Sequence, residues 1–123
     1  MTALSLRTTD NSGCRMVALV GEIDITNSAT LQADVEAIIE SASGPVIMDW
    51  SEVGFCDSSG INTLVVLARH ARAHSVDLAL AGVHGRVANV FTLTALDRVV
   101  PLYPDIATAL QALSGSARDQ AGA

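Results

Sequence analysis

Short apolar runs alternate with segments of helical periodicity along most of this chain, and no other feature of the sequence constrains its fold as strongly. Residues 46–48 are apolar at successive positions, which is typical of a strand buried on both faces of a sheet. Residues 31–39 place large aliphatic side chains at i, i+4, i+7 and i+8, one face of a helix, and residues 61–71 also follow helical spacing. Strands that alternate with helices need crossover connections, so this pattern predicts an α/β fold with a mostly parallel sheet.

A turn signal near the N-terminus adds an antiparallel strand to this pattern. Residues 10–13 read Asp-Asn-Ser-Gly between two apolar runs, which predicts a β-hairpin. Residues 76–81 and 99–102 predict two later strands, and Pro101 places the last one at a sheet edge because proline lacks a backbone N–H. The expected order is β-β-α-β-α-β-α-β-α, a mixed sheet of about five strands with about four helices and the first strand antiparallel at an edge.

The end of the chain sets the expected domain boundary. Asp105 can cap a last helix that carries apolar residues to position 113. Residues 114–123 are small and polar, which is typical of a frayed terminus. We therefore expect residues 1–113 to form a single domain and residues 114–123 to form a flexible tail.

Charge and composition argue against several classes of partner and site. Thirteen acidic against seven basic residues give a net charge of −6, which repels nucleic acid and anionic membranes, so we expect neither as a partner. No apolar stretch approaches the roughly 20 residues of a membrane helix, and residues 1–10 lack a secretory signal pattern, so we expect a cytoplasmic protein. Cys14 and Cys56 lie far apart without a CxxC motif, which favours two reduced thiols over a disulfide or zinc site. We expect no metal and no cofactor.

The segment Asp57-Ser58-Ser59-Gly60 joins a strand to a helix, which makes it the most informative part of the chain. Sites in parallel α/β sheets collect at the carboxyl ends of strands. The N-terminus of a helix presents free N–H groups and a partial positive charge, so a phosphate on Ser58, or less favourably on Ser59, would meet an anion site. Asp and Ser are also the commonest helix N-caps, and a capping role for these residues stays open.

A second polar corner, Gly21-Glu22-Ile23-Asp24, follows the second expected strand. If the second and third strands are neighbours, Asp24 lies close to Asp57. Two carboxylates near one hydroxyl suggest a metal site, a general base or a phosphorylation-sensitive surface, although a metal would need more oxygen ligands than the sequence offers. The alternative is that Glu22 and Asp24 are solvated turn residues and that Asp24 helps the next helix to start.

The helix that follows the serine pair has one face of special interest. Its apolar stripe centres near Ala68, and a helical wheel places Ser59, Asn62, Val66 and Arg69 on the opposite side. Single exposed apolar residues are ordinary. Val66 nevertheless lies on the same side as Ser59, so it is a candidate contact for a protein partner.

Three stretches of the chain together resemble the signature of the STAS domain: Val20-Gly21-Glu22-Ile23-Asp24, Met48-Asp49-Trp50-Ser51 and Phe55-Cys56-Asp57-Ser58-Ser59-Gly60-Ile61. More narrowly, they resemble the bacterial anti-sigma factor antagonists of the sporulation and general stress systems. The likeness spans residues 4–113, and it implies the STAS fold.

The resemblance also implies a function. The unphosphorylated antagonist would bind an anti-sigma factor, itself a serine kinase of the GHKL type, and so release the sigma factor. The kinase would phosphorylate the first serine of the box, here Ser58, and the phosphorylated form would let go until a PP2C-type phosphatase resets it. The family's upstream acid matches Asp24, which would lie beside the acceptor with Asp57 and Gly60. The domain itself would not be an enzyme.

This sequence departs from the family's usual pattern at two positions. Asn62 stands where many members have a second glycine, and Trp50 stands where a leucine is usual. Asn62 lies on the expected partner-facing side, so it bears on which kinase is recognised.

Two other functions stay open at this point. Some STAS domains are docking modules without a phosphorylation cycle. A hydrolase with Ser58 as its nucleophile would need a base within reach, and the histidines at positions 70, 74 and 84 come too late in the chain to favour it.

Overall fold

The computed structural model describes residues 3–122, with side chains as far as residue 114. These residues form a five-stranded sheet in the order β1-β2-β3-β4-β5. β1 pairs antiparallel with β2, and every later strand runs parallel to its neighbour. This topology confirms the predicted α/β fold with one antiparallel strand at an edge. The strands are β1 (Leu4–Asn11), β2 (Cys14–Ile23), β3 (Val46–Cys56), β4 (Leu78–Ala81) and β5 (Leu102–Tyr103).

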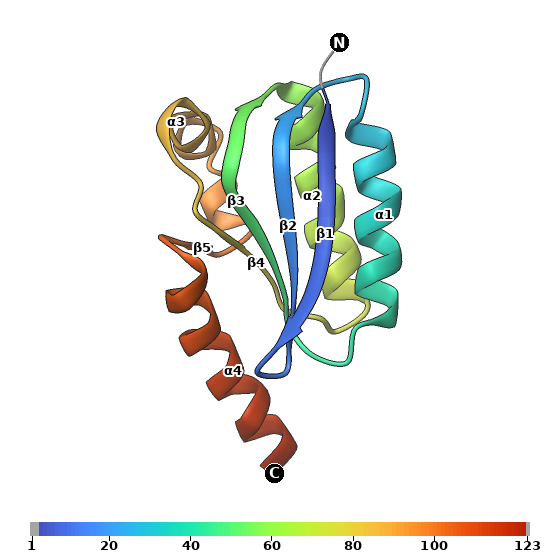
Figure 1. Ribbon diagram of the computed structural model, residues 1–123, viewed down its shortest axis with the longest axis vertical. Helices are drawn as coiled ribbons and strands as arrows, with labels where there is room; N and C mark the ends of the chain where they lie inside the picture. Colours follow the sequence, from blue (N-terminus) through green and yellow to red (C-terminus); the bar gives the residue numbers. More distant parts are fainter. Residues whose placement is uncertain (1–2, 123) are drawn as a thin grey trace.

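Helices cover both faces of this sheet. The helical elements are α1 (Ser28–Ser41), α2 (Ser58–Ala73), α3 (Gly85–Leu93), the short 3-10 turn η1 (Leu96–Arg98) and α4 (Ile106–Gly122). α1 and α2 lie side by side on one face, and α4 lies on the other (Figure 1). Because the strands alternate their side chains, the larger core forms on the α1 and α2 side, and Cys14, Ile47 and Ala81 meet α4 in a smaller one. None of the helices within the described residues combines the length and hydropathy needed to cross a membrane.

The predicted hairpin turn is confirmed. Ser12 and Gly13 have φ angles of 53° and 82°, and they connect Asn11 to its strand partner Cys14. Two central residues with positive φ are the signature of the two-residue turns that match the twist of a hairpin, and glycine adopts that conformation without strain.

Three strand boundaries differ from the sequence prediction. β3 continues to Cys56 instead of ending near position 50. Its pairing with β2 shifts register twice but is not broken, and it continues to the partners Ile23 and Cys56. β4 starts at Leu78 instead of position 76. The last strand is residues 102–103 and not 99–102, because the N–H groups of Val99 and Val100 both donate to the carbonyl of Leu96 in the η1 turn.

The C-terminal helix is longer than the sequence suggests. Asp105 caps it as expected, since its Oδ1 accepts a 2.7 Å hydrogen bond from the N–H of Thr108. The helix then continues to Gly122, beyond residue 113, the last apolar position that the sequence assigns to it. Residues 114–122 include two alanines, an arginine and a glutamine, which are strong helix formers that can carry a helix through one glycine.

Candidate functional site

The pairing of β2 with β3 builds the site. The two strands end together at the partners Ile23 and Cys56, and the N–H of Asp57 donates a 3.1 Å hydrogen bond to the carbonyl of Ile23. The corner after β2, which carries Asp24, therefore lies beside the corner after β3, which carries Asp57. This confirms the expectation that rested on these strands being neighbours.

Gly60 allows the first turn of α2 to pack closely on these two strands. A Cβ atom at this position would lie 2.4 Å from Sγ of Cys56 and 2.8 Å from Cγ2 of Ile23, both of which belong to buried residues. Any larger residue would push the start of α2 away from the strands. Gly60 thus fixes where the two serines of the box stand.

Asp57 is the N-cap of α2. Its Oδ1 accepts hydrogen bonds from the N–H of Ser59 at 2.9 Å, from the N–H of Gly60 at 3.3 Å and from the hydroxyl of Ser59. The capping role that the sequence left open is therefore filled by Asp57, and the Ser59 hydroxyl is committed to holding that carboxylate in place.

Ser58 differs from Ser59 in that its side chain is exposed at the first position of α2. Among the described residues, none forms a hydrogen bond with its hydroxyl. The anion site expected here is in large part already occupied, because the side chain of Asp57 accepts from two of the first three N–H groups of α2, those of Ser59 and Gly60. A phosphate attached to Ser58 would lie beside the carboxylate of Asp57, and the N–H groups of Ser59 and Gly60 would already be bonded to that carboxylate.

The Glu22 and Asp24 corner is built around the start of α1. Oδ1 of Asp24 accepts from the N–H and hydroxyl of Thr26, and its carbonyl accepts from the N–H of Ser28 at 2.9 Å. Asn27 bridges the corner, accepting from the N–H of Asp24 at 3.0 Å and donating to the carbonyl of Glu22 at 2.8 Å. These contacts bear out the alternative that Asp24 helps the next helix to start. Glu22 is exposed.

Asp57 stays ionised in this setting. The Ser59 hydroxyl holds the pKa of the Asp57 carboxyl below its ordinary value of 3.8, and the N–H groups of Gly60 and Ser59 act in the same direction. Partial removal from water and the negative charge of Asp24 both oppose this lowering of the pKa. The side of the box near Ser58 therefore carries two interacting carboxylates.

A groove beside Ser58 has α3 as its second wall. It has a volume of about 670 Å³ and runs from Asp57, Ser58 and Asn62 to Val90 and Thr94. An adjoining cavity of about 320 Å³ extends the same surface past Val90 to Glu22, Phe55 and Arg86. Sequence reasoning missed these α3 residues, because periodicity predicts a helix near position 90 without saying which strand end it covers.

Two exposed apolar side chains near the box also escaped the sequence analysis. Phe55 is 47% exposed at the end of β3, and Ile25 is 80% exposed directly after Asp24. Both positions stand next to motif residues. The sequence does not show that these side chains are exposed. For Phe55 the reason is that the alternation of inward and outward positions in β3 could not be followed beyond residue 50.

The predicted outer face of α2 is confirmed in part. Asn62 and Arg69 are exposed, whereas Ser59 and Val66 are half-buried. The buried stripe runs through Leu64, Leu67 and Ala71 and not through Ala68, which the sequence analysis placed at its centre. α2 packs against α1 as well as the sheet, and the sequence alone does not show where α1 lies.

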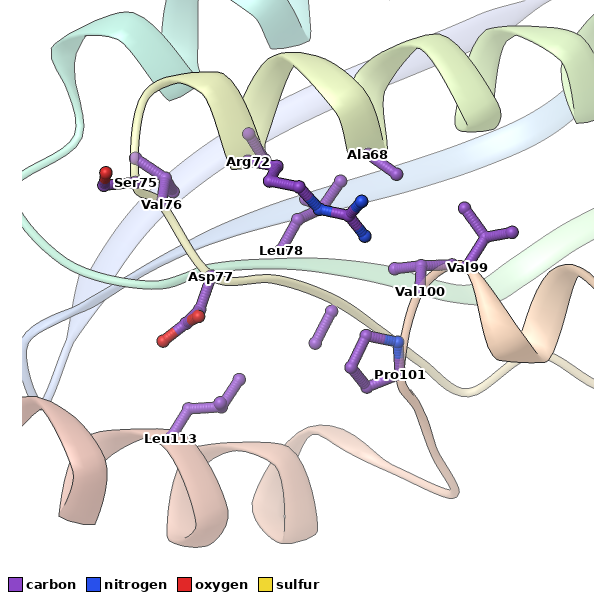
Figure 2. A pocket seen from close by; sticks show the side chains of 12 residues that line it. Ala68, Arg72, Ser75, Val76, Asp77, Leu78, Val99, Val100, Pro101 and Leu113 are labelled. Atoms are coloured by element: carbon purple, nitrogen blue, oxygen red, sulfur yellow. The ribbon is translucent and has the colours of Figure 1, made fainter.

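Another cavity, of about 510 Å³, opens at the far end of α2 between this helix, the start of β4 and α4. Figure 2 shows Arg72 extending from α2 over this cavity toward Val99 and Val100. It shares no lining residue with the groove at Ser58. The candidate site is therefore confined to the other end of the helix.

Comparison with known proteins shows which family this chain belongs to. A family model described as STAS domain matches residues 5–109. A Mycobacterium tuberculosis protein named as a candidate anti-anti-sigma factor is 33% identical over 116 residues, which cover 90% of this chain and 78% of that protein. A Bordetella bronchiseptica protein named as a candidate anti-sigma factor antagonist is 21% identical over 90 residues, covering 73% of this chain and 78% of that protein.

Solved structures share the fold. The crystal structure of an anti-sigma factor antagonist from Mycobacterium paratuberculosis superposes with a TM-score of 0.82 at 24% identity, covering 90% of this chain and 94% of that one. The phosphorylated form of the Bacillus cell fate determinant SpoIIAA gives a TM-score of 0.66 at 20% identity, covering 89% of this chain and 97% of that one.

Proposed function

Because this chain belongs to the STAS domain family, we propose that it acts as an anti-sigma factor antagonist in the cytoplasm. In its unphosphorylated form it binds an anti-sigma factor that is a serine kinase of the GHKL type, and this binding releases the sigma factor. The kinase phosphorylates Ser58 and the complex dissociates. A PP2C-type phosphatase then restores the binding form.

The environment of Ser58 carries this proposal. Of the two adjacent hydroxyls, that of Ser59 is held by Asp57, while that of Ser58 is exposed at the edge of a groove. A kinase can therefore reach the Ser58 oxygen without breaking the N-cap of α2. Phosphorylation of Ser59 would instead first remove a hydrogen bond from that cap.

The charge of a phosphate explains how binding is switched off. Phosphorylation adds about −1.5 to −2 charges beside Asp57 and Asp24. Because Asp57 already accepts from the N–H groups of Ser59 and Gly60, the phosphate gains little from the helix N-terminus and stays hydrated. Desolvating it against a partner without a basic residue would cost several kcal/mol at least, because roughly 2–7 kcal/mol is the cost for a neutral polar group and an ion costs more. Since every 1.4 kcal/mol is about tenfold, a loss of affinity of a hundredfold or more is expected.

The proposed contact surface surrounds this hydroxyl. It consists of Glu22, Asp24, Ser58, Ser59, Asn62, Val66 and Arg69, with Phe55 and Val90 as apolar members. Acidic residues lie at one end and Arg69 lies at the other, so a partner of mixed charge with a small apolar centre would fit.

No catalytic role is proposed for Ser58. His70 and His74 lie at the opposite end of α2, and Nε2 of His84 is 3.0 Å from the carbonyl of Ser51. A hydrolase would need a base beside its nucleophile. The relatives named above likewise bear the names of sigma-pathway antagonists and not of hydrolases.

Ser58→Asp tests the proposal, with Ser43→Asp as a matched control. Ser43 is an exposed serine in the loop after α1, so its replacement adds the same charge away from the groove. We expect the wild type, Ser58→Ala and Ser43→Asp to retain the same kinase partner from a lysate of the source cells, and Ser58→Asp to lose it. Incubation with that kinase and ATP should place a phosphate on Ser58 of the wild type and of Ser43→Asp, as mass spectrometry would show, and should leave Ser58→Ala unmodified.

Two results would contradict the proposal. A phosphate located on Ser59 would overturn the assignment of the acceptor. Equal capture by Ser58→Asp and the wild type, without phosphorylation of either, would instead indicate a docking module that has no phosphorylation cycle.

A further inference from the structure

Two helices bring together a cluster of histidines and glutamates at the end of α2 that lies away from Ser58. His70 lies in the last turn of α2 and His74 is the C-cap of that helix, while Glu36 and Glu40 are one turn apart on the facing helix α1. The ligand atoms of Glu40, His70 and His74 all lie within 4.8 Å of one another. Within the part of the chain that the structure describes, no other group of three such side chains is this close.

The backbone fixes the tautomer of His74. Its Nδ1 lies 2.9 Å from the carbonyl oxygen of His70, and a carbonyl can only accept, so Nδ1 carries the proton. Nε2 of neutral His74 therefore presents a lone pair. That is the form of histidine that binds metal ions, and a backbone carbonyl is a common partner for the other ring nitrogen.

His70 stands between the two glutamates of α1. Its Nε2 lies 2.8 Å from Oε2 of Glu40, and its Nδ1 lies 4.0 Å from Oε2 of Glu36. Gln32 donates a 3.4 Å hydrogen bond to Glu36 and helps to keep it there. With a metal on Nε2, the proton of His70 would move to Nδ1 and face Glu36, which reproduces the carboxylate–histidine–metal arrangement of many protein sites.

We propose that Glu40, His70 and His74 form a binding site for a divalent transition-metal ion, with Zn²⁺ as the best match, and that the carboxylate of Glu36 orients the ring of His70 from the side away from the metal. Two imidazoles and one carboxylate are a zinc ligand set, and a water would take the fourth position. Ligand atoms of a tetrahedral zinc site lie about 3.4 Å apart, as bonds of about 2.0–2.1 Å require. The ligand atoms of Glu40, His70 and His74 now lie within 4.8 Å of one another. Side-chain rotations that move them about an ångström closer together would give the spacing of a tetrahedral site.

The ion would link α1 to α2 far from Ser58. His70, the nearer of the two histidines, lies about 18 Å from Ser58 along the axis of α2, given the rise of about 1.5 Å per residue in a helix. It would stabilise the packing of these two helices without entering the groove at Ser58. Zinc binding is therefore expected to raise the temperature of unfolding and to leave the kinase-binding surface unchanged.

Zinc titration of the untagged full chain tests the site. Calorimetry of the wild type with zinc chloride should give one ion per chain and a rise in the unfolding midpoint. His74→Ala and Glu40→Gln remove one ligand each and should weaken binding at least about tenfold. Glu36→Gln should weaken it by about 10- to 100-fold, the usual range for a residue that orients a metal ligand. His84→Ala, an exposed histidine outside the cluster, is the matched control and should bind zinc as the wild type does.

The proposal is overturned if the wild type takes up no zinc, or if His74→Ala and Glu40→Gln both bind zinc as tightly as His84→Ala. Either result would mean that the cluster is an ion-paired contact between two helices and nothing more. If His74→Ala fails to fold, Glu40→Gln still decides the question, because this substitution changes only the end of an exposed side chain.

Discussion

Replacing Gly60 by alanine tests whether the close approach of α2 to the strands positions the site. The added Cβ would lie 2.4 Å from Sγ of Cys56 and 2.8 Å from Cγ2 of Ile23. Cys56 is 8% exposed and Ile23 is completely buried, so neither side chain can move into solvent. Either α2 must move away from the strands or the core must deform.

The expected magnitude follows from two opposing contributions. Extra atoms in a packed core destabilise by about 1–3 kcal/mol. Replacing glycine by alanine also restricts the unfolded chain, which stabilises by about 0.4–1 kcal/mol. The cost of the extra atoms is larger than the gain from restricting the unfolded chain, so Gly60→Ala should lower the free energy of unfolding by about 1–2 kcal/mol.

Urea unfolding measures this change, because the single tryptophan, Trp50, is completely buried and its fluorescence reports unfolding. Gly54→Ala is the matched control, since a Cβ at position 54 has no atom within 4 Å. Cys56→Ala removes the nearest obstructing atom, so Gly60→Ala should cost less in that background. The reasoning is refuted if Gly60→Ala is as stable as Gly54→Ala, or if its cost is the same with and without Cys56.

Further predictions concern the ionisable groups of the site. Ser59→Ala should raise the pKa of Asp57 and Asp24→Asn should lower it, as titration by NMR would show; shifts of the opposite sign would contradict the assigned causes. Because folding lowers the pKa of Asp57, the ionised carboxylate stabilises the folded state above about pH 4, and this stabilisation is lost as the pH falls through the lowered pKa. In Asp57→Asn the free energy of unfolding should therefore depend less on pH in the acid range. Burial, with a smaller contribution from the charge of Asp57, raises the pKa of the Cys56 thiol to about 12, so iodoacetamide at pH 8 should modify Cys56 only after unfolding, and rapid native labelling would argue against this burial.

Local patterns were sufficient for the topology. The hairpin residues 10–13, the helical spacing of residues 31–39 and the apolar run at 46–48 each act over a few residues, and the rules for crossovers then leave little choice of sheet order. Boundaries that depend on tertiary contacts were missed. The second half of β3 is held by its pairing with β2, and the turn at Leu96 that shortens β5 depends on which backbone groups are free to bond.

The candidate site divides in the same way. The box at positions 57–60 was visible because a strand end, a cap and a helix start follow one another in sequence. The α3 wall of the groove was not, because Val90 and Thr94 lie more than thirty positions after the serines. The histidine and glutamate cluster was missed for a similar reason. His70 and His74 are recognisable as a helical pair, but the glutamates that face them come from another helix whose rotation only packing determines.

Ser59 and Ser58 differ in whether their hydroxyl is bonded within the domain, and this difference affects which mutations can persist at each position during evolution. The hydroxyl of Ser59 is tied to Asp57, so its loss weakens the start of α2, and selection for a folded protein is enough to retain it. The hydroxyl of Ser58 is exposed, and no bond to it exists among the described residues. Loss of this hydroxyl therefore breaks no hydrogen bond within those residues, and selection for what the oxygen does outside the domain is what preserves it.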